Sequence, residues 1–265
     1  MTLRFSRKNL CIPYAVFLIC FVIVPVVVIM YYAFTNGSGQ FTLDNLFAFF
    51  SSANTIGTLC YSLAIAVIVT IVCLLIAYPV AYILAHIGLK RRNVLLILFI
   101  TPMWINFTLR ITAMKEVLSV IEGNMAYFPF VNTILGMTYD FLPFMILPLY
   151  STLIKMDKDL LEAASDLGAN GVKVFLKVTL QLSMPGIISG VMMVFLPAMT
   201  NYVILDMLYN STYIMGSLIG SYFSAYDWNG GSMISIVLLF IIFVATIVTN
   251  RFTDGEEVGN RGAAL

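Results

Sequence analysis

Some ionisable and aromatic side chains lie inside strongly apolar stretches of this sequence, and they are the first candidates for chemistry. Asp140 stands in the run TYDFLPF and Trp104 in TPMWINF. A carboxylate inside a membrane span is costly and suggests a function, and an indole ring can stack on a cation. Asp140 could also be a solvated helix start at the outer boundary, and Trp104 an ordinary interfacial tryptophan. The sequence leaves these alternatives open.

Further acids, amides and aromatics are expected at a similar depth, near the outer ends of the third, fourth and fifth apolar segments. Such a cluster, with few basic residues around it, would suit a positively charged substrate. The residues of this expected substrate path are Trp104, Asn106, Tyr139, Asp140, Tyr202 and Asp206.

The longest polar interruption between apolar blocks is residues 157–185, DKDLLEAASDLGANGVKVFLKVTLQLSMP. Its first half predicts a short amphipathic helix, which Asp157 or Asp159 could cap and Gly168 could end. A second short helix is expected from about 171 to 182. The first helix combines an apolar and an acidic face, which suits docking into another protein. Its apolar positions are Leu160, Leu161, Ala164 and Leu167.

The composition places these residues in a polytopic, all-α membrane protein. The 265-residue chain is 61% hydrophobic and only 10% charged, whereas soluble domains carry roughly 25% charged residues. A span needs about 20 apolar residues, and we expect six transmembrane helices. They are placed at 11–34, 58–87, 93–109, 132–153, 184–205 and 228–250.

The charge pattern predicts the orientation of these spans. With a cytoplasmic N-terminus, 12 of the 14 Lys and Arg residues lie on the inside, and only Arg110 and Lys115 lie outside. Because Lys and Arg favour cytoplasmic loops, both termini and residues 157–185 are expected in the cytoplasm. The polar tail after Arg251 is expected to be loose.

Several familiar catalytic patterns are missing from the sequence. It contains no GxxxxGK[ST], HExxH or GxSxG motif and no Cys/His cluster. The single histidine, His86, is expected at a membrane interface as a structural residue. We therefore predict a non-catalytic membrane subunit that binds no cofactor and no metal, and that draws energy from a partner or a gradient.

Part of the polar stretch resembles a known motif. Glu162-Ala163-Ala164, followed by Gly168, is similar to the E-A-A, three residues, G pattern in the cytoplasmic loop of permease subunits of bacterial ABC importers. In that family the loop is the coupling helix that seats in a groove of the ATPase subunit. Gln181 stands where the family pattern has proline. The resemblance implies ATPase-coupling residues at Glu162, Ala163, Ala164, Asp166 and Gly168.

The resemblance extends along nearly the whole chain. The segments FTLDNL, TPMWINFTLR, LPFMILPLYSTL, LLEAASDLGA and MPGIISGVMMVFLPAM, in this order, look like a permease of bacterial spermidine/putrescine ABC importers. This implies a type I importer domain at 55–250 with its coupling loop at 157–183, preceded by a first helix and outer loop at 1–54 and followed by a cytoplasmic tail at 251–265. One departure is visible, because Tyr209 and Asn210 stand where family members often have a Gly-Gly pair.

The resemblance also implies partners and a mechanism. The expected partners are an ATPase dimer that binds ATP-Mg, a second homologous permease, an extracytoplasmic polyamine-binding protein and the bilayer of the bacterial inner membrane, but no nucleic acid. The expected function is polyamine import by alternating access. The alternatives are a type I ABC permease for another solute, such as ferric iron, thiamine, sulfate or an amino-acid derivative, and a gradient-driven secondary transporter. No inverted repeat of the kind that many secondary transporters show is visible.

Overall fold

The computed structural model describes residues 11–123, 127–208 and 210–262. These residues form helices and connecting segments, with one isolated antiparallel bridge between Thr35 and Phe41. The chain divides into two compact units. The first unit contains residues 1–59 and 217–242, and the second contains residues 60–216 and 243–265.

The first unit is built around the end of its N-terminal helix. Two asparagine side chains hold the carbonyl groups where this helix stops: Asn45 Nδ2 donates to the oxygens of Ala33 and Thr35, and Asn229 Nδ2 donates to those of Tyr32 and Thr35. These bonds satisfy acceptors that a helix end leaves open. The unit comprises α1 (Cys11–Leu18), η2 (Ile19–Ile23), α2 (Val24–Ala33), α3 (Asp44–Ser51) and parts of α4 (Ala53–His86), α13 (Met215–Ser224) and α14 (Trp228–Gly262).

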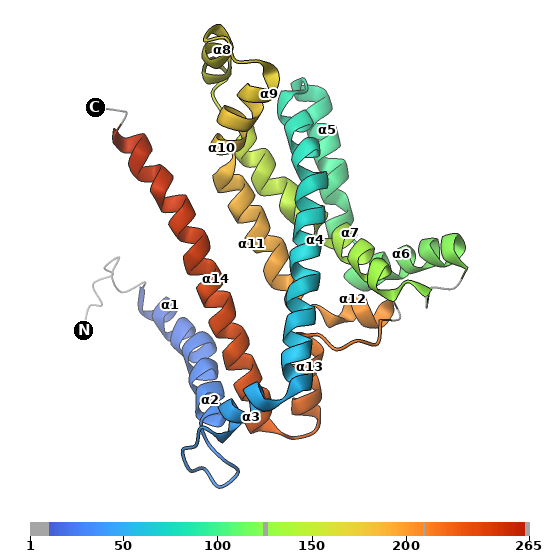
Figure 1. Cartoon of the computed structure of the whole chain (residues 1–265), viewed down its shortest axis with the longest axis vertical. Helices are drawn as coiled ribbons and strands as arrows, with labels where there is room; N and C mark the ends of the chain where they lie inside the picture. Colours follow the sequence, from blue (N-terminus) through green and yellow to red (C-terminus); the bar gives the residue numbers. More distant parts are fainter. Residues whose placement is uncertain (1–10, 124–126, 209, 263–265) are drawn as a thin grey trace, which may run out of the picture. The chain divides into compact units, whose positions relative to one another are not determined.

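The second unit contains most of the remaining helices. In Figure 1, α8 lies at one end of this unit, and α6 and α12 lie near the other end of α7. Its elements, besides parts of α4, α13 and α14, are α5 (Leu89–Ile100), η3 (Thr101–Trp104), α6 (Phe107–Glu122), α7 (Pro129–Leu153), α8 (Lys158–Asp166), α9 (Gly171–Val174), η5 (Phe175–Thr179), α10 (Leu180–Leu182), α11 (Met184–Thr200) and α12 (Tyr202–Met207).

Close packing of α7 against α11 forms the centre of the second unit. Gly186 and Gly190 stand one turn apart on α11, the spacing that lets membrane helices approach closely. A Cβ atom at Gly186 would lie 2.6 Å from Thr152 Oγ1 and 3.0 Å from the Pro148 carbonyl oxygen. Larger side chains at these positions would therefore push the two helices apart.

Four helical segments of the described residues are long and apolar enough to cross a membrane. They are Pro13–Ala33, Ala53–His86, Pro129–Leu153 and Trp228–Thr249. Two bent helix pairs raise the number to six if each pair counts as one span. The four uninterrupted segments match the expected first, second, fourth and sixth spans.

The expected third and fifth spans are interrupted, so their expected ends at 109 and 205 are wrong. The third ends at Trp104, where the chain turns and α6 begins at an angle of 101°. The fifth segment, α11, ends at Thr200, and α12 begins at Tyr202. The apolar run continues through both corners, so hydropathy alone did not locate them.

The tail also differs from the expectation. Residues 251–262 continue α14, which ends at Gly262, whereas the sequence was expected to be loose after Arg251. The basic residues Arg4, Arg7 and Lys8, which contributed to the expected orientation, lie outside the described residues.

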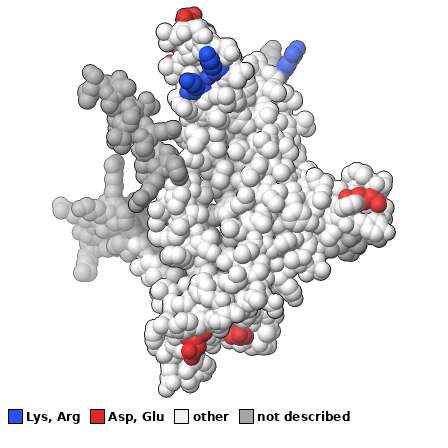
Figure 2. All heavy atoms as spheres, viewed as in Figure 1, with Lys and Arg blue, Asp and Glu red and all other residues white. Residues whose placement is uncertain are grey.

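The charged side chains of the second unit are unevenly distributed. Figure 2 shows Lys and Arg side chains near the α8–α9 end and beside the start of α5, and acidic side chains both at the tip of the α8 end and on α6. The exposed basic residues of this unit include Arg91, Lys155, Lys173 and Lys177.

Candidate functional site

Local capping sets both ends of α8. The carboxylate of Asp157 accepts a hydrogen bond of 3.0 Å from the Asp159 amide, as expected for a capping residue. Gly168 has a φ of +83°, the left-handed conformation in which glycine carries no steric cost. Its amide donates to Ser165 O, and the Ala169 amide donates to Ala164 O. This pair of bonds is the Schellman motif, and it confirms the expected role of Gly168.

The surface of α8 combines acidic and apolar residues. Glu162, Ala163 and Asp166 are exposed, and so is Leu167, at 89%. Ala164 is half-buried, because α8 packs against α9 and η5. The helix therefore leaves one acidic and apolar surface available for a partner.

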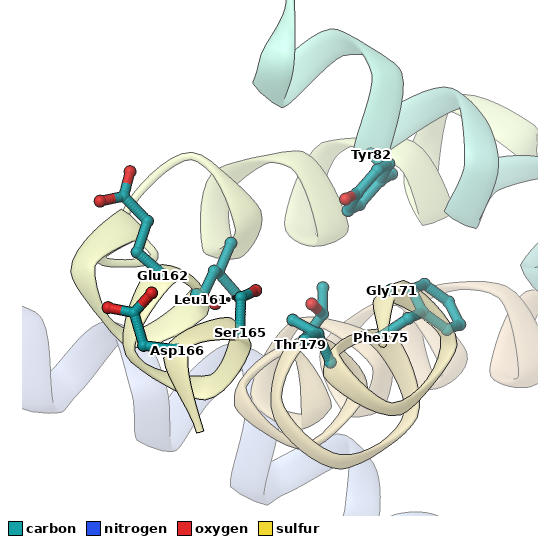
Figure 3. A pocket seen from close by; sticks show the side chains of 9 residues that line it. Tyr82, Leu161, Glu162, Ser165, Asp166, Gly171, Phe175 and Thr179 are labelled. Carbon is teal, nitrogen blue, oxygen red and sulfur yellow. Dashed lines mark hydrogen bonds between the residues drawn. The ribbon is translucent and has the colours of Figure 1, made fainter. Parts of the chain in front are cut away.

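A hollow of about 420 Å³ lies between α8 and the helices behind it (Figure 3). Leu161 and Ser165 line it from α8, Phe175 and Thr179 from η5, and Tyr82 from α4. In Figure 3, Glu162 and Asp166 point away from Tyr82 and Phe175. The acidic side chains therefore lie at its edge, and its wall combines aromatic, aliphatic and hydroxyl side chains.

The expected second helix, from about 171 to 182, is confirmed as the run α9–η5–α10, which ends at Leu182. Gln181 lies inside α10, and the chain bends by 63° between Leu182 and Met184. A proline at 181 would disturb the helix because it lacks an N–H group and collides with the preceding turn. With glutamine in that position, the bend occurs at Ser183 instead.

The residues of the expected substrate path lie at the η3–α6 corner, near the middle of α7 and on α12. Trp104 ends η3 at the corner between α5 and α6 and is 87% exposed in the single chain. Asn106 is exposed and caps α6, because its Oδ1 accepts a hydrogen bond of 2.9 Å from the Thr108 amide. Asn106 is thus also the signal for the corner that hydropathy did not reveal.

The other expected path residues belong to α7 and α12, which pack against each other and against α6. Tyr139 is on α7, and Tyr202 and Asp206 are on α12. All three are exposed in the single chain. The structure thus brings the two helices that carry these residues together and against α6, while their role in binding stays a prediction.

Asp140 differs from the other path residues because it is buried and paired. Its Oδ1 lies 2.6 Å from Arg110 Nη2, and the two side chains are only 4% and 8% exposed. Asp140 is therefore not at a solvated helix start. Sequence reasoning missed this pair, since it counted Arg110 as an outer-loop charge. The available signal was that Arg110 and Asp140 are opposite charges that both stand in apolar surroundings.

Hydrogen bonds from two asparagine side chains support this part of the unit. Asn132 Nδ2 donates to Glu122 Oε2 at 3.0 Å, which joins the end of α6 to the start of α7. Asn210 Nδ2 donates to Tyr61 Oη at 3.1 Å and to Thr133 Oγ1 at 2.9 Å. Asn210, noted from the sequence only as a departure from a Gly-Gly pair, thus links the segment after α12 to α4 and α7. Tyr209 lies outside the described residues.

Among the residues that the structure describes, no three His, Cys, Asp or Glu side chains are grouped as metal ligands. On α8, Glu162 and Asp166 stand four residues apart.

Comparison with known families identifies the protein class. Residues 77–255 match the model of the binding-protein-dependent transport system inner membrane component family. The chain belongs to this family. The matched region begins within α4 and includes all of α7, α8 and α11.

Members of the family with known names align over most of the chain. The spermidine/putrescine transport system permease protein PotB of Haemophilus influenzae is 36% identical over 282 residues, covering 96% of this chain and 98% of that protein. The PotB protein of Escherichia coli is 36% identical over 224 residues, covering 78% of this chain and 81% of that protein.

Solved structures support the fold. A chain of a bacterial alginate ABC transporter, in complex with a periplasmic protein bound to alginate pentasaccharide, superimposes with a TM-score of 0.73 at 14% identity and covers 93% of both chains. A second structure of an alginate-importing ABC transporter gives a TM-score of 0.67 at 16% identity, with 92% of this chain and 94% of that chain covered. This chain is thus a multi-pass permease subunit with the fold of ABC importer membrane components.

Proposed function

We propose that this permease is the membrane subunit of an ATP-driven importer of the polyamines spermidine and putrescine. The observation that carries the proposal is the 36% identity to the Haemophilus influenzae spermidine/putrescine permease over 96% of the chain. The alginate importers share only the fold, so they do not favour a saccharide as the substrate.

The proposed arrangement has six spans, of which the third ends at Trp104 and the fifth is α11, and both termini lie in the cytoplasm. The excess of basic residues on the α8 side supports this orientation. Arg110, one of two basic residues assigned to the outside, is paired with Asp140. The membrane is the bacterial inner membrane.

In this proposal α8 is the coupling helix of the permease. One copy of an ATPase dimer receives its exposed surface, on which Glu162, Asp166 and Leu167 lie. A second homologous permease offers an equivalent helix to the other ATPase copy. ATP and Mg²⁺ bind to the ATPases, and this chain holds no cofactor. An extracytoplasmic polyamine-binding protein delivers the substrate at the other side.

The proposed substrate path runs past the corner of α5 and α6 and past α12. Trp104, Tyr139 and Tyr202 offer aromatic faces to ammonium groups, and Asn106 and Asp206 offer oxygen acceptors. The path thus matches molecules that carry several ammonium groups on a flexible apolar chain.

Asp140 contributes to this path by cancelling the charge of Arg110. An unpaired guanidinium about 8 Å from a passing ammonium group would repel it by about 2 kcal/mol at an effective dielectric constant of about 20. The ion pair removes most of this barrier, so a cation can pass the buried arginine.

Alternating access would couple movement of α8 at the cytoplasmic side to opening of the substrate path at the outer side. ATP binding closes the ATPase dimer and moves α8. The spans to which α8 is connected rearrange, and the path opens to the outside to receive a polyamine. Hydrolysis of ATP resets the complex, and the substrate leaves to the cytoplasm.

The test is uptake by the whole complex in proteoliposomes that contain this permease, the second permease, the ATPase and the binding protein. Labelled spermidine and putrescine should accumulate only with ATP. Accumulation of a different solute, such as thiamine or an amino-acid derivative, in place of polyamines would overturn the proposed substrate. Polyamine uptake that depends on an ion gradient and not on ATP would overturn the proposed energy source.

A further inference from the structure

The α8 helix reaches the spans through two routes. Along the chain, the short segment after Leu153 joins it to α7. Through space, α8 packs against α9 and η5, and η5 in turn contacts α4. This second route therefore reaches α4, which does not adjoin α8 in the sequence. The second route depends on a few aromatic contacts.

Phe175 of η5 touches two tyrosines of α4. Its ring centroid lies 5.6 Å from that of Tyr78 and 6.2 Å from that of Tyr82, with interplanar angles of 87° and 82°. Both contacts have the edge-to-face geometry that aromatic pairs prefer. Tyr78 and Tyr82 stand four residues apart and so face the same side of α4. Phe175 therefore contacts two successive turns of one face of α4.

A buried hydrogen bond ties the far end of the same segment to α4. Tyr78 Oη and Ser183 Oγ are 3.0 Å apart, and Ser183 is fully buried. Ser183 Oγ donates to the Leu180 carbonyl oxygen at 2.9 Å, so the tyrosine hydroxyl donates to Ser183. Because the 63° bend lies at Ser183, Tyr78 fixes the bend point to α4. We call Tyr78, Tyr82, Phe175 and Ser183 the aromatic brace.

The backbone of η5 supports this arrangement. Residues Phe175–Thr179 form a π-helical turn, in which the Leu180 amide donates to the Phe175 carbonyl oxygen. Turns of this kind are rare and occur often at functional sites. The brace thus includes Phe175, the first residue of a turn that departs from regular helix geometry, and Ser183, which follows the turn. Gln181 allows the helical run to continue to Leu182.

We propose that the aromatic brace passes the movement of α8 to α4, so that Tyr78, Tyr82, Phe175 and Ser183 are positioning residues for transport. The inference rests on the proposed function, since it assumes that an ATPase moves α8. On this account α4 and α7 move together when α8 moves, because α7 is joined to α8 along the chain and α4 is joined to it through the brace.

The decisive variant is Phe175→Ala in the complete, reconstituted complex. The exposed surface of α8 is unchanged, so association with the ATPase and ATP hydrolysis should stay within about twofold of the wild type. Uptake per ATP hydrolysed should fall at least about fivefold, because α4 no longer follows α8. A role in packing alone would lower hydrolysis and uptake together.

Two comparisons sharpen the test. Leu176→Ala changes the exposed neighbour of Phe175 on η5 and should leave the ratio of uptake to hydrolysis near the wild-type value. Phe175→Tyr keeps a ring in place and should restore most of the coupling. If Phe175→Ala fails to fold and insert into the membrane, Tyr78→Phe, which removes only the hydroxyl that reaches Ser183, should lower the same ratio by about twofold.

The outcomes separate this inference from the proposed function. A wild-type complex that neither binds the ATPase nor takes up polyamines contradicts the proposed function. If the wild type transports and both Phe175→Ala and Tyr78→Phe keep its ratio of uptake to hydrolysis, the aromatic brace does not transmit the movement. Loss of ATPase association in Phe175→Ala would also overturn the inference, since the ring would then serve docking.

Discussion

The two ends of the second unit hold their functional residues in place in different ways. At the α8 end, contacts within a few residues of each other define the helix: Asp157 caps its start and Gly168 ends it. At the α6 end, the contacts join residues far apart in the chain, such as Arg110 with Asp140. The α8 surface is thus a short, locally determined element, whereas the path region depends on how several helices pack.

This difference suggests how each end can change during transport. A helix with its own caps can move as a body and keep its shape when a partner pulls on it. A region held by an ion pair and by the Asn210 hydrogen bonds can rearrange only if helices exchange those contacts. The following variants test whether the two ends differ in this way.

Breaking the Arg110–Asp140 pair has the largest expected effect. Arg110→Met or Asp140→Leu alone leaves a buried charge without its partner, which should cost about 3–5 kcal/mol of stability. The double variant removes both charges and should recover most of that loss. Thermal unfolding of the purified permease would measure the effect, and a double variant no more stable than either single variant would show that the two charges do not act as a pair.

Disturbing the contact between α7 and α11 should have the next largest effect. Gly186→Ala places a methyl group against Thr152 and the Pro148 carbonyl oxygen and should cost about 1–3 kcal/mol. Gly57→Ala on α4 is the matched control, because a Cβ atom there meets nothing within 4 Å. The control should be neutral or slightly stabilising, since alanine favours helix more than glycine does. Equal unfolding temperatures for the two variants would contradict the close packing.

The sequence predicts the α8 end better than the α6 end. Local patterns predict that Asp157 caps α8, that Gly168 ends it and that the second helix ends at 182, because capping depends on residues within one turn. The corner after Trp104 was not expected, since the apolar run continues through it and only Asn106 marks the new helix. The pairing of Arg110 with Asp140 joins residues 30 positions apart and depends on the packing of α6 against α7, so no local pattern predicts it.

Removing the amide of Asn210 should have a moderate effect at the α6 end. Asn210→Ala deletes two hydrogen bonds to α4 and α7 and should lower stability by about 1–2 kcal/mol. Tyr61→Phe deletes only one of these bonds and should cost less. Unfolding measurements on both variants would check the order, and an unchanged Asn210→Ala variant would mean that these bonds contribute nothing measurable.

Changing the end of α8 should have the smallest effect on the whole protein. Gly168→Ala forces a residue with a side chain into a φ of +83° and should loosen the helix end by about 1 kcal/mol. Gly171→Ala is the matched control, because a Cβ atom meets nothing within 4 Å at either glycine and Gly171 has no positive φ. Hydrogen exchange of the amides at the end of α8 should become faster in Gly168→Ala only. Equal exchange in both variants would argue against the left-handed cap.

The central claim is that α8 couples this permease to an ATPase that drives polyamine import. Its most direct test is a charge reversal, Glu162→Lys, compared with Glu116→Lys, which reverses an exposed acidic residue on α6. Co-purification of the ATPase with the permease and ATP-dependent spermidine uptake are measured together, after membrane insertion has been checked. We expect Glu162→Lys to insert normally and to lose at least about tenfold in both measurements, with Glu116→Lys close to the wild type. Normal co-purification and normal uptake in Glu162→Lys would contradict the coupling role of α8.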